Sequence, residues 1–186
     1  MLAIKRTLLT QHRSRENDPV EAVVGILIMD DNPVGLSILL IHRIERDDDP
    51  WSGQMGLPGG RVEESDSSTK HALEREVREE VGIDLQRVGE EIGLLSIGHP
   101  MRRTEMKVQP RVYGLKTKPE VVIGPEVKEA FWIPVSKLLS NSGSAQVQIR
   151  GEVREVPAFL IDGRVVWGFT HRVLSELLEI LRVAQH

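Results

Sequence analysis

The sequence contains no cysteine. Disulfide frameworks, zinc–thiolate sites and cysteine nucleophiles are therefore excluded, and the composition is compatible with a cytoplasmic protein. The chain also lacks an apolar run of the ~20 residues that a transmembrane helix requires, so no membrane partner is expected. Residues 1–17 are rich in arginine but have no apolar core of about 7–15 residues. We therefore expect them to remain in the mature protein as an N-terminal extension rather than to act as a signal peptide.

The chain has no excess of positive charge. Its 24 Lys and Arg residues stand against 28 Asp and Glu residues, which gives a formal net charge of −4. Because positive charge drives binding to nucleic acid, nucleic acid is not expected as the main partner. The 186 residues, of which 40% are apolar, suit one buried core, so a single domain over residues 1–186 is predicted.

Hydrophobic patterning predicts several strands and two long helices. Residues 67–81 carry Leu73, Val77 and Val81 at helical spacing, and Gly82 is a typical residue to end the helix. A second helix is expected over residues 170–183, and residues 141–144 are expected to form a loop. Strands are predicted at residues 20–29, 37–43, 92–97, 108–115, 130–135, 156–161 and 165–167. This pattern indicates an α/β protein in which helices cover a mixed β-sheet.

Three glutamates project from one face of the first predicted helix. Glu76, Glu79 and Glu80 are three and four residues apart, a spacing that puts their Cβ atoms about 5–6 Å from one another. Carboxylates this close repel unless a cation lies between them, and Mg²⁺ or Mn²⁺ prefers such oxygen ligands. Residues 53–60 contain four glycines, which let another group approach the backbone. Because Mg²⁺ usually shares its coordination with substrate phosphates, the pattern indicates a phosphate-bearing substrate.

The same glutamates also have a simpler interpretation. Glutamate-rich helices are common, and Glu74 with Arg78, or Arg75 with Glu79, could form ordinary surface pairs four residues apart. Such pairs contribute about 0.3–0.5 kcal/mol each and need no metal. The functional interpretation is favoured by a fixed order along the chain: a double glycine, an Arg-Glu pair, a Glu-Glu pair and a final Gly-Ile.

This order resembles the signature of the Nudix hydrolase family, which reads Gly, five residues, Glu, seven residues, Arg-Glu, an apolar residue, any residue, Glu-Glu, any residue, Gly and an apolar residue. Residues 75–83 match every specified position of the second half. In the first half, one residue more than the signature specifies separates Gly60 from Glu76. We interpret the extra residue as a loop insertion, with Asp66 in the acidic position that usually holds the arginine in this family.

The resemblance implies a Nudix α/β/α sandwich, with a mixed β-sheet between helices, and a Nudix box at residues 59–83. It implies a hydrolase that cleaves the diphosphate of a nucleoside diphosphate linked to another moiety, with Mg²⁺ or Mn²⁺ as the cofactor. The metal ion is expected on Glu76, Glu79 and Glu80, together with the carbonyl of Gly60.

Three glutamates are candidates for the general base. Glu79, Glu126 and Glu129 qualify because a carboxylate beside the attacking water can take its proton. Glu129 has the alternative of an ordinary surface pair. Arg75 is expected to orient a neighbouring carboxylate rather than to touch the substrate.

Two segments are similar to the coenzyme A pyrophosphatase branch of the family. They are residues 53–60, Gly-Gln-Met-Gly-Leu-Pro-Gly-Gly, and residues 166–170, Val-Trp-Gly-Phe-Thr. The upstream arginines of that branch are only partly matched by Arg43, and the aspartates at 47–49 are poor neighbours for the extra phosphate of coenzyme A. Coenzyme A or a derivative is therefore one candidate substrate. ADP-ribose, a dinucleotide or a nucleoside triphosphate is the alternative.

Further substrate contacts are expected from basic and aromatic side chains. Arg43, Arg61 and Arg103 are candidates to bind phosphates, and Trp51 is a candidate to stack on a base. Each has an ordinary alternative, since basic residues in loops are usually just solvated and Trp51 could be partly buried. Trp167 lies in an apolar strand and is expected in the core.

A different class of function stays open, that of a non-catalytic nucleotide-binding module with the Nudix fold. The imperfect first half of the box permits it, whereas three clustered acids that repel without a metal argue against it. The sequence is compatible with a homodimer, because Nudix active sites are sometimes completed across a dimer interface.

Overall fold

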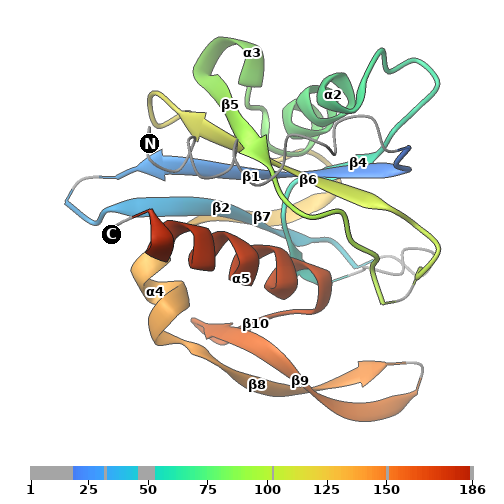
Figure 1. Ribbon diagram of the computed structural model, residues 1–186, viewed down its shortest axis with the longest axis vertical. Helices are drawn as coiled ribbons and strands as arrows, with labels where there is room; N and C mark the ends of the chain where they lie inside the picture. Colours follow the sequence, from blue (N-terminus) through green and yellow to red (C-terminus); the bar gives the residue numbers. More distant parts are fainter. Residues whose placement is uncertain (1–18, 32, 46–52, 102, 150, 185–186) are drawn as a thin grey trace.

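A mixed β-sheet forms the centre of the molecule (Figure 1). The computed structural model describes residues 19–31, 33–45, 53–101, 103–149 and 151–184. The sheet strands in these residues are β1 (Ala22–Asp30), β2 (Leu36–Arg43), β3 (Met55–Gly56), β4 (Gly59–Arg61), β5 (Gly89–Leu94), β6 (Val108–Leu115) and β7 (Val127–Pro134). Their order is β3–β2–β1–β6–β5, with β4 paired to β1 and β7 paired to β2. β1 and β6 are parallel, and the other pairs are antiparallel.

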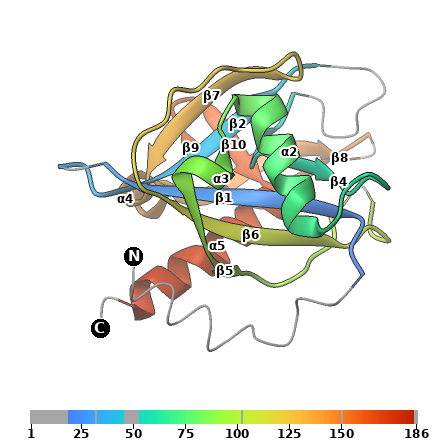
Figure 2. The ribbon, with the colours of Figure 1, turned by 90° about the horizontal axis from the view of Figure 1, so that it is seen from above.

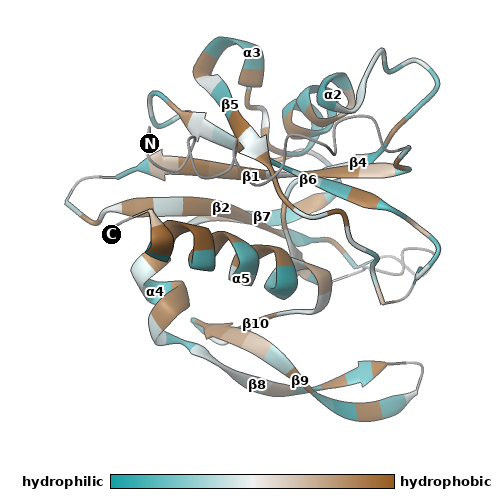
Figure 3. Cartoon of the chain, viewed as in Figure 1, coloured by the Kyte–Doolittle hydropathy of each residue, from teal (hydrophilic) through white to brown (hydrophobic). Residues whose placement is uncertain are grey.

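Two long helices, α2 (Thr69–Val81) and α5 (Gly168–Val183), cover opposite faces of this sheet (Figures 1 and 2). Successive side chains of a strand point to opposite faces. In β1, Leu27 belongs to the apolar cluster that contains Leu73 of α2, whereas Ile26 belongs to the cluster that contains Leu174 of α5. Apolar residues accordingly concentrate on the central strands and on the inner side of α5 (Figure 3). This arrangement confirms the predicted α/β/α sandwich.

The boundaries of α2 follow from its own sequence. The hydroxyl of Ser68 accepts a hydrogen bond from the N–H of His71 at 3.1 Å, which satisfies one of the free donors at the helix start. At the other end Gly82 has a φ of 69°, and its N–H donates to the carbonyl of Arg78. Glycine adopts this left-handed conformation without strain, which explains why the predicted end of the helix is correct.

A second sheet of β8 (Ser142–Ile149), β9 (Glu152–Ile161) and β10 (Arg164–Trp167) lies on the α5 side (Figure 1). Its hairpin of β8 and β9 extends away from the central sheet. Two short helices, α3 (Leu85–Val88) and α4 (Val135–Ser140), complete the described elements. Over the described residues, every helix falls short of the length and apolar character that crossing a bilayer requires.

Two predicted segments are wrong in detail. Residues 141–144 are not a loop, because β8 begins at Ser142 and pairs along its whole length with β9. The strand expected at 92–97 lies three residues earlier, at Gly89–Leu94, with a bulge between Glu91 and Gly93. In both segments the position of the strand is set by backbone hydrogen bonds to the next strand of the chain. The polar residues within the segment do not predict this position.

The packing of α2 predicts a large cost for truncating Leu73, which is fully buried against β1. The Leu73→Ala variant should lose about 2–5 kcal/mol of unfolding free energy, because it removes apolar contacts and leaves a cavity. The exposed Leu139 of α4 provides the matched control, and Leu139→Ala should change stability by less than about 0.5 kcal/mol. Urea unfolding of both variants measures the difference, and equal effects would contradict this packing.

Candidate active site

Of the three α2 glutamates predicted to hold a metal, Glu76 and Glu80 line a cleft, whereas Glu79 lies at the surface. Glu80 is 3% exposed, and the side chain of Glu76 is 16% exposed. The side chain of Glu79 is 60% exposed and does not line the cleft. The pair Glu76 and Glu80 is four residues apart, slightly more than one helical turn, and so points to one side of α2.

Both carboxylate oxygens of Glu80 accept hydrogen bonds from other elements. Oε1 accepts one from Nη1 of Arg43 at 2.7 Å, and Oε2 accepts one from the N–H of Gly59 at 2.8 Å. Burial nevertheless raises the pKa of Glu80 to about 7, because the loss of water disfavours the charged form more than these donors favour it. Arg43 also donates from Nη2 to Oε2 of Glu126 at 3.4 Å. Glu80 therefore ties α2 to both β2 and β4.

Arg75 is held by Asp66. Its Nε and Nη2 donate to the two carboxylate oxygens of Asp66 at 3.2 and 2.9 Å, and its Nη1 donates to Oε1 of Glu76 at 2.9 Å. The bonds from Arg75 lower the pKa of Asp66, whereas burial raises the pKa of Glu76. Asp66 thus occupies the place that the loop-insertion interpretation predicts, and Arg75 contacts the carboxylate of Glu76.

Gly59 and Gly60 bring the backbone of β4 against these carboxylates. Gly59 has a φ of 143°, and a Cβ there would collide with the carbonyl of Val23. A Cβ on Gly60 would lie 2.5 Å from Cδ of Glu76. A larger residue at position 59 would push β4 away from β1, whereas one at position 60 would displace the carboxylate of Glu76.

The cleft has a volume of about 320 Å³. Its charged lining consists of Arg43, Arg61, Glu76, Glu80 and Glu126. A second part of the lining, here named the apolar flank, consists of Pro100, Met101, Met106, Trp167 and Phe169. These residues come from the segment between β5 and β6, the end of β10 and the first turn of α5. The sequence pattern assigns Trp167 to the core, and the structure places it on the cleft instead.

The NUDIX domain family model matches residues 19–151, which include all five charged residues of the cleft. The chain belongs to the Nudix family. This membership confirms the resemblance that the box residues carry. Trp167 and Phe169 of the apolar flank lie beyond the matched range.

Two curated relatives of this Nudix chain are named coenzyme A diphosphatases. The human mitochondrial coenzyme A diphosphatase NUDT8 is 31% identical over 134 residues, which are 69% of this chain and 56% of the relative. The Caenorhabditis elegans peroxisomal coenzyme A diphosphatase ndx-8 is 31% identical over 145 residues, which are 75% of this chain and 59% of the relative. The chain therefore spans little more than half the length of either relative. Since these two are named for mitochondria and peroxisomes, the cytoplasmic location expected from composition stays a prediction.

Among solved structures, the NUDIX domain of Shewanella oneidensis NrtR, complexed with ADP ribose, superposes with a TM-score of 0.56. The match covers 97% of this chain and 98% of that chain at 18% identity. At this identity the likeness supports the Nudix fold alone. The expectations of a single domain over residues 1–186 and of a homodimer stay predictions.

Besides Glu79, the predicted site residues Glu129 and Arg103 do not line the cleft. Glu129 of β7 points to the face of the sheet covered by α5, where its Oε2 accepts a hydrogen bond from Nη2 of Arg164 at 2.9 Å. This bond lowers the pKa of Glu129. Arg103 follows β5 in a loop but does not line the cleft. Trp51 lies outside the described residues.

Over the described ranges, no three acidic or histidine side chains are already arranged to hold a metal ion. Glu76 and Glu80 bond to arginines instead. Their chemistry nevertheless fits a hard divalent cation, because carboxylate oxygens from both residues face one cleft. Burial raises the pKa of both groups, so their negative charge is incompletely compensated, and a bound cation would relieve this imbalance.

The raised pKa of Glu80 predicts that the metal-free protein loses stability as the pH rises. The carboxyl keeps its proton up to about pH 7 in the folded chain but releases it near the ordinary value of 4.5 when unfolded. The folded state binds more protons in this range, so raising the pH from 5 to 8 should lower the unfolding free energy by up to about 3 kcal/mol. Glu80→Gln lacks the group and should show a smaller fall. Urea unfolding of both proteins in EDTA measures the difference, and parallel pH profiles would contradict it.

Proposed function

We propose that this Nudix chain is a divalent-metal-dependent pyrophosphohydrolase acting on a nucleoside diphosphate linked to another moiety, with coenzyme A or a derivative as its substrate. The observation that carries the proposal is the pair of buried Glu80 and half-buried Glu76, held against the glycine backbone of β4 in a cleft that also contains Arg43 and Arg61. A cleft of this kind combines acidic oxygens for a metal with cationic groups for phosphate.

Glu76, Glu79 and Glu80, with the carbonyl of Gly60, are the proposed holders of Mg²⁺ or Mn²⁺. When bound, the ion would neutralise charge on the diphosphate and favour attack by water. Glu79 would have to turn inward from its exposed position, whereas Glu76 and Glu80 already face the cleft. Arg75, held by Asp66, would keep Glu76 in place while the substrate binds.

The cationic side chains of the cleft suit the phosphate oxygens. Arg61 is exposed at the rim, and Arg43 lies beside Glu80 and Glu126. Their positive charge would fix the diphosphate and stabilise the charge that develops on phosphorus during displacement. In the reaction water forms the new P–O bond, the bridging P–O bond breaks, and the bridging oxygen leaves with one phosphate.

Glu126 is the favoured general base, with Glu79 as the alternative. Its side chain lines the cleft and is 46% exposed, so water can reach it. The loop that carries it is fixed to α2, because the N–H of Gly124 donates to the carbonyl of Glu80 at 2.9 Å. A carboxylate in this position can accept the proton of the attacking water.

Coenzyme A is supported as the substrate by the two coenzyme A diphosphatases at 31% identity. The volume of about 320 Å³ falls within the range of small-molecule sites. The apolar flank would take a part of the substrate outside the diphosphate. ADP-ribose, a dinucleotide or a nucleoside triphosphate is retained as the alternative substrate.

A substrate panel tests the proposal. The purified chain is incubated with coenzyme A, ADP-ribose, dinucleotide polyphosphates, reduced nicotinamide dinucleotide and nucleoside triphosphates, each with Mg²⁺, Mn²⁺ or EDTA, and the products are identified by mass. We expect metal-dependent cleavage of coenzyme A at its diphosphate, with one phosphate left on each product and the extra phosphate retained on the nucleotide product. Preferred cleavage of ADP-ribose would overturn the substrate, and binding without any turnover would favour a nucleotide-binding module.

Glu80→Gln should lower kcat by at least about 100-fold, because it removes a proposed metal ligand that acts in the transition state. Glu74→Gln makes the same chemical change on the same helix but outside the cleft, so its kcat should stay within about twofold. Steady-state kinetics on the best substrate measure both. Near-normal turnover by Glu80→Gln would refute the assignment of the site.

Variants of Glu126 and Glu129 test which of these carboxylates is the general base. Glu126→Gln should lower kcat by at least about tenfold, because the proton acceptor is lost, and should flatten the acidic limb of the pH–rate profile. Glu129→Gln should lower kcat far less, because Glu129 pairs with Arg164 on the other face of the sheet. Equal losses in both variants would contradict this choice.

A further inference from the structure

Arg172 on α5 connects the apolar flank of the cleft to the body of the protein. Its guanidinium carbon lies 5.1 Å from the ring centroid of Phe169, one turn earlier on the same helix. An arginine over an aromatic ring is attracted to it and holds it in place. Phe169 is part of the apolar flank, so Arg172 touches the wall of the cleft without lining it.

The same arginine also fixes the chain segment that follows β5. Nη2 of Arg172 donates to the carbonyl of Ser96 at 3.0 Å, and Oε1 of Glu176 accepts the N–H of Ser96 at 2.8 Å. Nη1 of Arg172 donates in turn to Oε2 of Glu176 at 3.2 Å. Two side chains of α5 therefore satisfy both backbone groups of one residue, which anchors this segment as a neighbouring strand would.

Gly98 makes this arrangement possible. A Cβ at this position would lie 2.8 Å from Cζ of Arg172 and 2.9 Å from Cε2 of Phe169. Both distances are shorter than side chains tolerate, so the arginine and the ring pack directly on the glycine backbone. Gly98 also pairs with Val108 at the start of β6. The segment is thereby held at both sides just before it supplies Pro100, Met101 and Met106 to the cleft.

We propose that Arg172 is a positioning residue that fixes the apolar flank, and that it thereby sets the affinity for the part of the substrate beyond the diphosphate. The proposal rests on the proposed function for its substrate, and on the contacts of Arg172 for its mechanism. The contacts of Arg172 described above are with Phe169, Ser96 and Glu176, whereas Glu76 and Glu80 belong to the charged lining of the cleft. Its loss should therefore weaken binding and leave the chemical step intact.

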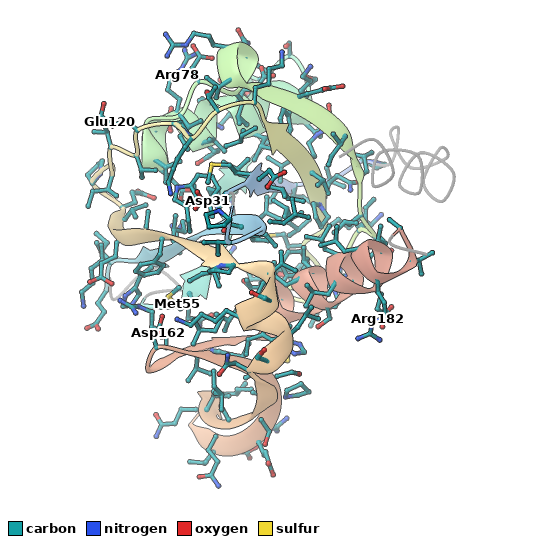
Figure 4. The ribbon with its side chains drawn as sticks, turned by 90° about the vertical axis from the view of Figure 1, so that its left-hand side faces the viewer. Asp31, Met55, Arg78, Glu120, Asp162 and Arg182 are labelled. Atoms are coloured by element: carbon teal, nitrogen blue, oxygen red, sulfur yellow. The ribbon has the colours of Figure 1, made fainter. Side chains whose placement is uncertain are left out.

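Steady-state kinetics with coenzyme A test whether Arg172 affects substrate binding and not the chemical step. Arg172→Leu should raise KM about tenfold with kcat within about twofold, the pattern of lost binding that is equal in the ground and transition states. Arg172→Lys keeps the charge but offers one nitrogen in place of the two that bond Ser96 and Glu176, so its KM should be intermediate. Arg182→Leu is the matched control, since Arg182 is exposed at the far end of the same helix (Figure 4). Its KM and kcat should match those of the parent chain.

Methionine methyl resonances provide a readout that does not depend on turnover. In Arg172→Leu the methyl signals of Met101 and Met106 should shift, while that of Met29, which is buried in β1, should stay in place. Gly98→Ala disturbs the same packing by placing a methyl group against Arg172 and Phe169. It should shift the same two signals and raise KM. If Arg172→Leu does not fold, the Gly98→Ala variant still tests the proposal.

The outcomes separate the two proposals. An unchanged KM, or a loss confined to kcat, in both Arg172→Leu and Gly98→Ala would overturn the role of Arg172. Unmoved Met101 and Met106 signals in folded variants would do the same. If the parent chain cleaves no substrate, the proposed function fails, and the methionine spectra with coenzyme A binding measured in EDTA then decide the role of Arg172.

Discussion

The burial of the Glu80 carboxylate is the constraint on which the rest of the site depends. A carboxylate that is 3% exposed needs hydrogen-bond donors, and only other parts of the chain can supply them. Arg43 at the end of β2 and the N–H of Gly59 in β4 fill this need. Three segments that lie far apart in the sequence therefore meet at one carboxylate. The apolar face of α2 supplies the packing that holds the carboxylate there.

The sequence predicts those features whose information is local. The extent of α2, its end at Gly82 and the bond between Arg75 and Asp66 all follow from residues within one short stretch. Features that depend on pairing between distant segments are not predictable in this way. The strand from Ser142 and the position of Glu129 on the far face both follow from strand partners and sheet alternation. The pattern of residues alone therefore left Glu79, Glu126 and Glu129 all as candidates for the general base.

The extra residue before α2 illustrates how the site tolerates a change of length. The insertion lies in the exposed loop, and Asp66 still reaches Arg75 with two hydrogen bonds. The helix keeps its register, so the positions of Glu76 and Glu80 relative to Gly59 are unaffected. Loops absorb insertions far more readily than helices, in which one added residue rotates every later side chain by about 100°.

The two flanks of the cleft come from separate stretches of the chain. The charged lining comes from β2, β4, α2 and the residue before β7, whereas the apolar flank comes from the segment after β5, the end of β10 and the start of α5. Mutations in one stretch can accumulate while the other remains constant. In evolutionary terms, a lineage with this architecture can acquire new specificities through drift at a few apolar positions, and its ancestral chemistry is inherited unaltered.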